Sequence, residues 1–184
     1  MVKHYLTDRY HPLPDNYIPQ DLVRAPVPFL APLNDLKRYI CAIAYDPLRK
    51  LFNACFRDGL NLMGISAFRS YERQKEIYDN SIRNRGKEYT AKCIAYPGTS
   101  EHQTGLAIDV SCPSVDYELC EEFEYTPEGI WLKKHAEAFG FVFSFTRENE
   151  ELTGFVNEPW HIRYHCHDAT FYPFQSSATD KYFL

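Results

Sequence analysis

YPGTSEHQTGLAIDVS, residues 96–111, places a histidine and an aspartate seven positions apart among small and apolar residues. Over residues 106–110, apolar side chains occupy every second position, which is the pattern of a strand with one buried face. Asp109 falls on the other face of that strand. Gly105 permits a turn that brings His102 back toward Asp109, so the stretch predicts a loop and a strand that hold two polar side chains together.

The stretch NEPWHIRYH, residues 157–165, alternates apolar residues with His161 and two further polar residues. This alternation predicts a strand in which His161 shares a sheet face with Asp109. With His102, the set becomes two imidazoles and one carboxylate, which is a candidate ligand set for zinc. Three protein ligands leave one tetrahedral position for a water that loses a proton near neutral pH, as in catalytic zinc sites.

Glu158 precedes His161 by three residues, and Pro159 lies between them. A carboxylate beside a zinc-bound water is a suitable general base for hydrolysis. Strict strand alternation would send Glu158 to the face opposite His161, so this role depends on a bend at Pro159. The plainer interpretation of Glu158 is a surface acid at the end of a hairpin.

Each of the other candidates also has a plainer explanation when taken alone. A histidine such as His102 in a glycine-rich loop is ordinarily solvated or hydrogen-bonded, and an isolated Asp109 is typical of a turn cap. Arg69, at the start of a predicted helix, would pair with an acid of that helix. Trp160 would be a core residue.

The composition is that of a globular protein. The chain has 184 residues, of which 45% are hydrophobic and 16% aromatic, enough for one domain with its own core. A formal net charge of −5 without a Lys/Arg-rich run argues against a nucleic-acid partner. No apolar run is long enough to span a membrane. The first residues lack the apolar core of a secretory signal, so we expect a cytoplasmic protein if the chain is complete and a cell-envelope protein if an export segment is missing.

The six cysteines are too few for a disulfide scaffold, and none forms a CxxC pair. We expect most of them to be buried thiols. Cys112 and Cys120 flank a short polar loop, and whether they pair in an oxidising compartment is left open.

Prolines recur between Pro12 and Pro32 and exclude regular helix from residues 1–32. We expect these residues to form an extended arm packed on the rest of a single domain, residues 33–184. The patterns in that domain predict helices at 33–44, at 46–59 with Asp46 as cap and Pro47 in the first turn, at 70–82 capped by Ser70, and at 126–140, with strands at 60–67, 106–111, 141–145 and 154–164. The prediction is an α+β fold with a small central antiparallel sheet flanked by helices.

Taken together, SxHxxGxAxD at residues 100–109 and ExxH at residues 158–161 resemble the signature of the VanY-type D-alanyl-D-alanine carboxypeptidases, which are zinc peptidases related to VanX and VanXY. Further blocks look similar and come in the same order, namely HPLPDNYIPQDLV, FRSYERQKEIY, WLKKHAEAFGF and LTGFVNEPWHIRY. The resemblance covers roughly residues 6 to 164 and implies a hedgehog/DD-peptidase-like zinc fold.

The resemblance also implies roles for individual residues. One zinc ion per chain would be held by His102, Asp109 and His161. Glu158 would be the catalytic base, and Arg69 would bind the substrate and the oxyanion formed as water attacks the carbonyl. We place three further residues in the substrate cleft: Gln74, Ser100 and Trp160.

The implied activity is removal of the C-terminal D-alanine from peptidoglycan stem pentapeptides or from precursors that end in D-Ala-D-Ala, by a protein expected to be monomeric. Two alternatives keep the same residues, an LD-carboxypeptidase acting on tetrapeptides and a D-Ala-D-Ala dipeptidase of the VanX/VanXY kind. A third alternative is a non-catalytic module that binds the cell wall. An intact Glu158 beside a complete ligand set argues against the third, because a binding module has no use for the base. A role in wall remodelling or in antibiotic resistance is left open.

Overall fold

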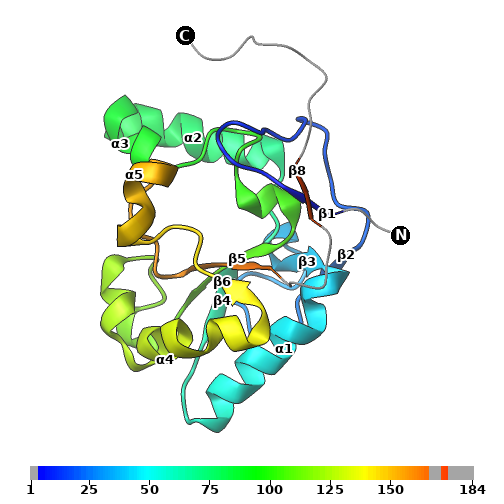
Figure 1. Ribbon diagram of the computed structural model, residues 1–184, viewed down its shortest axis with the longest axis vertical. Coiled ribbons are helices and arrows are strands. Elements are labelled where there is room, and N and C mark those ends of the chain that lie inside the picture. The colour runs from blue at the N-terminus through cyan, green and yellow to red at the C-terminus, as the bar shows by residue number, and fades with distance from the viewer. Residues whose placement is uncertain (1–3, 166–170, 174–184) are drawn as a thin grey trace.

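The computed structural model describes residues 4–165 and 171–173 (Figure 1). Its centre is a four-stranded antiparallel sheet in the order β4-β5-β7-β6. The strands are β4 (Met63–Ser66), β5 (Ala107–Ser111), β6 (Phe141–Val142) and β7 (His161–Tyr164). Helices α1 (Ala42–Arg57) and α4 (Pro127–His135) lie on one side of this sheet, and α2 (Tyr71–Arg85) and α3 (Lys87–Cys93) lie on the other (Figure 1). The predicted single α+β domain with a small antiparallel sheet is confirmed.

Strand β5 is buried on both faces, whereas its sequence predicted one buried face. Ile108 and Val110 belong to the hydrophobic core, as expected from the alternation. Asp109 is also only 3% exposed, because polar side chains rather than solvent surround it. The polar face of β5 is therefore a closed site.

Two helices begin where the capping residues predicted. The Ser70 side chain accepts a hydrogen bond from the Arg73 backbone N–H at 3.2 Å, and the Thr126 side chain accepts one from Gly129 at 3.0 Å. These bonds satisfy N–H groups that a helix start leaves unpaired. The α4 segment continues as a 3-10 turn and ends at Gly140, whose φ of +80° suits glycine.

The prediction of a helix at residues 33–44 is wrong. The structure has a 3-10 turn at Leu36–Arg38 and then strand β3 (Tyr39–Cys41), which pairs antiparallel with β2 (Leu22–Arg24). Pairing with the N-terminal segment buries Ile40 completely, and this tertiary contact outweighs the helical pattern.

The start of α1 is also different from the prediction. The helix begins at Ala42, four residues before Asp46, so Asp46 is not its cap and Pro47 lies inside the helix. Asp46 instead accepts hydrogen bonds from the Arg49 side chain. The predicted end is correct within two residues, since α1 stops at Arg57 and Gly59 follows with a φ of +80°.

The remaining strands are shorter than predicted, and several short elements were not predicted at all. They include α3, α5 (Glu150–Thr153) and the 3-10 turns Glu101–Thr104, Pro113–Val115, Glu121–Tyr125 and Arg147–Asn149. Helix α3 buries only Thr90. Such short, polar elements carry no apolar repeat that a sequence pattern could reveal.

The N-terminal segment contributes to the core as well as covering it. Residues 4–32 contain β1 (His4–Leu6) and β2 but no helix, and β1 pairs in parallel with β8 (Phe171–Pro173). Its buried members of the core cluster are Ala25, Val27, Phe29 and Ala31. The division of the chain at residue 32 stays a prediction.

Two smaller expectations concern cysteines and membranes. Cys112 and Cys120 are both free thiols, so the pair that the sequence left open is not formed. Cys166 lies outside the described residues.

Among the helices that the structure describes, none combines the length and the apolar character needed to cross a bilayer.

Candidate active site

The register of the central sheet brings Asp109 and His161 together. The two residues are direct partners across β5 and β7, so their side chains share one face of the sheet. Asp109 Oδ1 lies 3.0 Å from His161 Nδ1, and the residues are 3% and 2% exposed. This confirms that His161 shares a sheet face with Asp109.

His102 reaches the same carboxylate from the loop before β5. Its Nδ1 donates a hydrogen bond to the Ala67 backbone carbonyl at 2.7 Å. Because a carbonyl only accepts, Nδ1 carries the hydrogen, and Nε2 is the nitrogen left to bind a metal. Nε2 lies 3.1 Å from Asp109 Oδ2. Gly105, where the sequence predicted a turn, has a φ of +71°, in the left-handed region that suits glycine.

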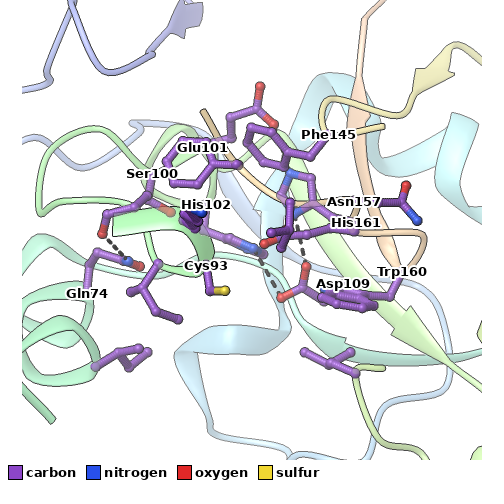
Figure 2. A pocket seen from close by; sticks show the side chains of 18 of the residues that line it. Gln74, Cys93, Ser100, Glu101, His102, Asp109, Phe145, Asn157, Trp160 and His161 are labelled. Carbon is purple, nitrogen blue, oxygen red and sulfur yellow. Dashed lines mark hydrogen bonds and ion pairs between the residues drawn. The ribbon is translucent and has the colours of Figure 1, made fainter. Parts of the chain in front are cut away.

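One ligand atom from each of His102, Asp109 and His161 can be chosen so that all three lie within 4.8 Å of one another. Figure 2 shows the three side chains pointing toward a common point, with a dashed line from the Asp109 carboxylate to each imidazole. Two imidazoles and one carboxylate are the donor set of catalytic zinc sites, so these residues fit the predicted ion.

Electrostatics keep two of the three side chains, Asp109 and His102, in the protonation states that bind a metal. Burial opposes charge on Asp109, but His102 and His161 outweigh burial and hold the pKa of the carboxyl well below its ordinary value. Burial and the nearby Arg69 lower the pKa of His102, so its imidazole is kept neutral. An ionised carboxylate and a neutral imidazole are the protonation states that bind a metal.

Sequence reasoning missed Glu101, which is the second carboxylate partner of His161. Glu101 Oε2 lies 2.8 Å from His161 Nε2, and Oε1 accepts a hydrogen bond from Arg163 Nε at 2.7 Å. Burial works against its charge, but Arg163 and His161 outweigh it and lower the pKa of Glu101 to about 2. The pair also fixes which nitrogen of His161 faces Asp109. Two features of the sequence could have indicated this contact. Glu101 is next to His102, and Arg163 falls on the same face of the predicted strand as His161.

Arg69 is held beside the cluster by three partners. Its guanidinium donates to Gln74 Oε1 at 2.9 Å, to Ser66 Oγ at 3.3 Å and to Asp109 Oδ2 at 3.3 Å. Gln74 is almost fully buried and uses its amide nitrogen on the Ala95 carbonyl at 2.7 Å. Both polar ends of the Gln74 amide are therefore paired, and one of them supports Arg69. The predicted contact of Gln74 with substrate stays a prediction.

Glu158 sits at the turn that enters β7. The His161 backbone N–H donates to the Glu158 carbonyl at 3.1 Å, which is the bend that the sequence predicted around Pro159. The carboxyl lines the same cavity as the cluster. Burial raises its pKa to about 7, although nearby His161 offsets part of the increase. A carboxyl with a pKa near neutrality can both take up and give back a proton.

A cavity of about 720 Å³ opens over the cluster. Ser100 and Trp160, both predicted to bind substrate, line it. Phe145 lies against His161, with ring centroids 5.1 Å apart (Figure 2). The cavity thus brings together every residue that the sequence singled out for the site, which are His102, Asp109, His161, Glu158, Arg69, Gln74, Ser100 and Trp160.

Comparisons with known proteins agree on one family. The family model described as D-alanyl-D-alanine carboxypeptidase, VanY, matches residues 37–167. The chain is 42% identical over 159 residues to the putative carboxypeptidase YodJ of Bacillus subtilis (strain 168), a match that covers 86% of this chain. It spans only 58% of the length of YodJ.

Two solved structures are similar in fold as well as in sequence. The LdcB LD-carboxypeptidase, whose structure addresses peptidoglycan recognition, has a TM-score of 0.80 at 42% identity and is covered over 74% of its chain and 86% of this one. A vancomycin resistance D,D-pentapeptidase, VanY from a VanB-type cassette in complex with Zn(II), has a TM-score of 0.68 at 30% identity. That match covers 86% of this chain and 85% of VanY.

Proposed function

This chain belongs to the VanY family of D-alanyl-D-alanine carboxypeptidases, and from that membership we propose that it is a zinc carboxypeptidase that removes the C-terminal D-alanine of peptidoglycan stem pentapeptides or their precursors. The observation that carries the proposal is the convergence of His102, Asp109 and His161 in a cavity that Glu158 and Arg69 also line. A binding module would not need a carboxyl with a near-neutral pKa beside a metal ligand set.

The predicted zinc ligands are His102, Asp109 and His161, with one ion per chain. An ion bound there would supply a positive charge that polarises a peptide carbonyl and lowers the pKa of a water. Zn(II) is present in the similar VanY structure, which supports this choice of metal.

Glu158 is proposed to move the proton. As a carboxylate it takes a proton from the attacking water, and as a carboxylic acid it gives that proton to the nitrogen of the departing amino acid. A pKa of about 7 suits both halves of this cycle. Its backbone is held by the turn to His161, which keeps the base close to the metal ligands.

Arg69 is proposed to stabilise negative charge in the cleft. Its guanidinium is oriented by Gln74 and Asp109, so its remaining N–H groups are presented in a fixed direction. Such a group stabilises the oxyanion that develops on the scissile carbonyl and attracts the free carboxylate of the substrate. Ser100 and Trp160 complete the proposed substrate cleft.

The second candidate is an LD-carboxypeptidase that cleaves tetrapeptides. The observation in its favour is the likeness to LdcB, which has the higher TM-score and the higher identity of the two structures compared. The catalytic residues would be the same in both cases, and the shape of the cleft would decide between them. A dipeptidase acting on free D-Ala-D-Ala is the third possibility to test.

Mass spectrometry of the products from muropeptides that end in four or five residues tests these alternatives. Release of D-alanine from the pentapeptide alone supports the DD activity, and release from the tetrapeptide alone replaces it with the LD activity. Free D-Ala-D-Ala is included to detect a dipeptidase. Zinc-loaded Glu158→Gln is the matched control and should release far less product than the wild type. If the zinc-loaded wild type hydrolyses none of these substrates, the proposed function is wrong.

The assembly of the proposed enzyme is a separate expectation. The chain is expected to act as a monomer. Sedimentation velocity at micromolar concentration measures this directly.

A further inference from the structure

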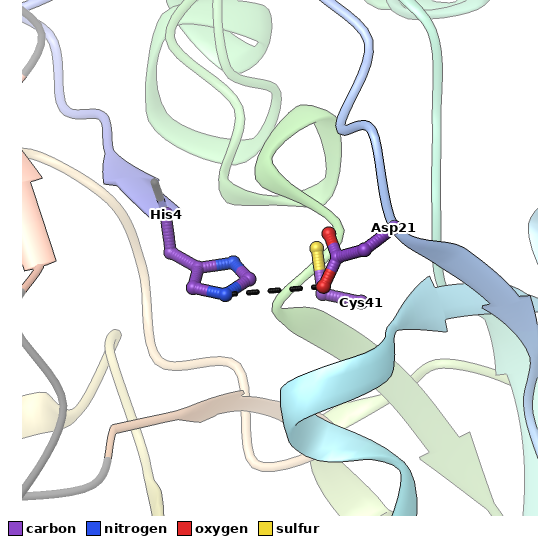
Figure 3. Close-up of side chains that lie close together, drawn as sticks. All are labelled: His4, Asp21 and Cys41. Carbon is purple, nitrogen blue, oxygen red and sulfur yellow. Dashed lines mark ion pairs between the residues drawn. The ribbon is translucent and has the colours of Figure 1, made fainter. Parts of the chain in front are cut away.

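A second cluster of metal-binding side chains lies apart from the proposed active site (Figure 3). His4 comes from β1, Asp21 from the loop before β2, and Cys41 from the end of β3. One ligand atom from each can be chosen so that all three lie within 4.8 Å of one another. His4 is 9% exposed and Cys41 is fully buried, while the Asp21 side chain is 16% exposed. Three segments that are distant in sequence therefore direct a nitrogen, an oxygen and a sulfur to one point.

One oxygen of the Asp21 carboxylate is left unsatisfied by the described residues in this cluster. Asp21 Oδ1 is buried and has no hydrogen-bond partner among the residues that the structure describes. The other oxygen, Oδ2, lies 3.8 Å from His4 Nε2, which is too far for a hydrogen bond. A buried carboxylate oxygen without a partner destabilises a fold unless a cation or a donor compensates for it.

We propose that His4, Asp21 and Cys41 form a second metal site, which binds a zinc-like divalent cation and attaches the N-terminal segment to the active-site loop. The donor set decides the class of metal, because a thiolate and an imidazole favour zinc over magnesium or calcium. Zinc bonds of about 2.0 to 2.2 Å to nitrogen and oxygen place two such tetrahedral ligand atoms roughly 3.3 to 3.5 Å apart. His4 Nε2 and Asp21 Oδ2 lie 3.8 Å apart, so a small side-chain adjustment would bring them to the distance that a zinc ion requires.

The protonation state of Cys41 determines how the ion would bind. Burial and the charge of Asp21 raise the pKa of the thiol, so without an ion it keeps its proton. The thiol donates a hydrogen bond to the Thr104 carbonyl at 3.3 Å. Binding forms a metal–sulfur bond and releases one proton to solvent, and the two positive charges of the cation offset the thiolate and the carboxylate.

Cys41 connects the proposed second site to the loop of the active site. The Cys41 backbone N–H donates to the Gly105 carbonyl at 2.8 Å, and its sulfur contacts Thr104. Both partners lie in the segment between His102 and Asp109, two of the proposed active-site ligands. An ion at the second site would therefore join the N-terminal segment, through His4 and Asp21, to the loop that positions the first site.

Cobalt substitution of the full chain tests the second site directly. A thiolate bound to Co²⁺ gives an intense charge-transfer absorption in the near ultraviolet, whereas the His102, Asp109 and His161 set contains no sulfur. We expect metal-free wild type to bind two equivalents of Co²⁺ and to show this absorption. Cys41→Ser should lose the absorption and retain the weaker visible absorption of the cobalt bound at the active site.

Cys93→Ser is the matched control, because Cys93 is a half-buried thiol that lines the active-site cavity. The control should keep the near-ultraviolet absorption, which locates the thiolate at Cys41. Asp21→Asn should weaken binding of the second equivalent at least tenfold. The proposal is wrong if folded wild type binds only one equivalent without the absorption, or if Cys41→Ser keeps it. The wild-type measurement decides the question even if the variants fail to fold, and it does not depend on peptidase activity.

Discussion

Glu101 Oε2 lies 2.8 Å from His161 Nε2, on the side of the imidazole opposite Asp109. His161 is thus held between two carboxylates, one at each ring nitrogen. Burial opposes a charge on this ring, but the hydrogen bonds to Asp109 and Glu101 outweigh burial and raise its pKa to about 10. In the metal-free protein the imidazole therefore carries a proton on Nδ1, facing Asp109, where a metal would bind.

Zinc binding at the active site should release that proton. At pH 7 the metal-free His161 is protonated, and a metal-bound Nδ1 cannot be, so about one proton leaves His161 per ion bound. Calorimetry in buffers with different ionisation enthalpies measures the number of protons released. The measurement is made on a variant that combines Cys41→Ser and Glu158→Gln, because the proposed second site and Glu158 would release protons of their own. A binding heat that is the same in every buffer for this variant would contradict the protonated imidazole.

Glu101→Gln should weaken zinc binding at the active site by about 10 to 100 fold, because partners of metal-bound histidines typically have effects of this size. The amide keeps the shape of the side chain but removes the charge that orients His161 and pairs with Arg163. Competition with a chromophoric chelator measures the affinity. Glu88→Gln, an exposed acid on α3, is the control and should leave the affinity unchanged.

Glu158→Gln should lower kcat by about 10² to 10⁴ fold while zinc stays bound, since only the proton transfer is lost. In the wild type, kcat/KM should fall as the pH drops, because the base acts only when ionised. The midpoint is expected at or below about pH 7, since a bound cation favours the carboxylate over the acid. Metal analysis of the variant separates a lost base from a lost ion.

The same substitution should stabilise the metal-free protein at high pH. The folded-state pKa of Glu158 is raised to about 7 from an ordinary 4.5, so the fold favours its neutral form. The resulting contribution to stability is fully present below pH 4.5 and is lost as the pH rises through 7. At pH 8 we expect Glu158→Gln to raise the free energy of unfolding by about 1 to 3 kcal/mol, and at pH 4 to change it little. Urea denaturation at the two pH values checks the sign, and equal effects at both would refute it.

Arg69→Lys should reduce kcat/KM by about 10² to 10³ fold, the range for removing a donor that stabilises an oxyanion. A lysine keeps the charge but cannot make the parallel contacts by which Gln74 and Asp109 orient the guanidinium. Gln74→Ala should have a smaller effect, because it loosens Arg69 without removing it. An unchanged kcat/KM in Arg69→Lys would contradict a direct role for Arg69.

The sequence predicted the parts of the site that depend on local pattern. The alternation around Asp109 and His161 predicted two strands whose polar faces meet, and β5 and β7 pair in that register. Ser70 and Thr126 correctly marked helix starts, because capping depends on only a few neighbouring residues.

The parts that the sequence did not reveal depend on contacts between distant segments. The pairing of Glu101 with His161 and Arg163 joins residues about sixty positions apart, and no local pattern indicates it. The strand at Tyr39–Cys41 likewise exists because β2 is available to pair with it. Its residues alone favoured a helix.

Phe29 shows how closely the N-terminal segment fits the rest of the molecule. Its ring lies against Gly64 in β4, and a methyl group added at Gly64 would come within 2.5 Å of that ring. A shortened version starting at residue 33 would therefore leave a hollow beside β4 and expose the apolar side chains around it. We expect such a truncation to aggregate on expression. A shortened version for crystallisation should therefore keep the segment that contains Phe29.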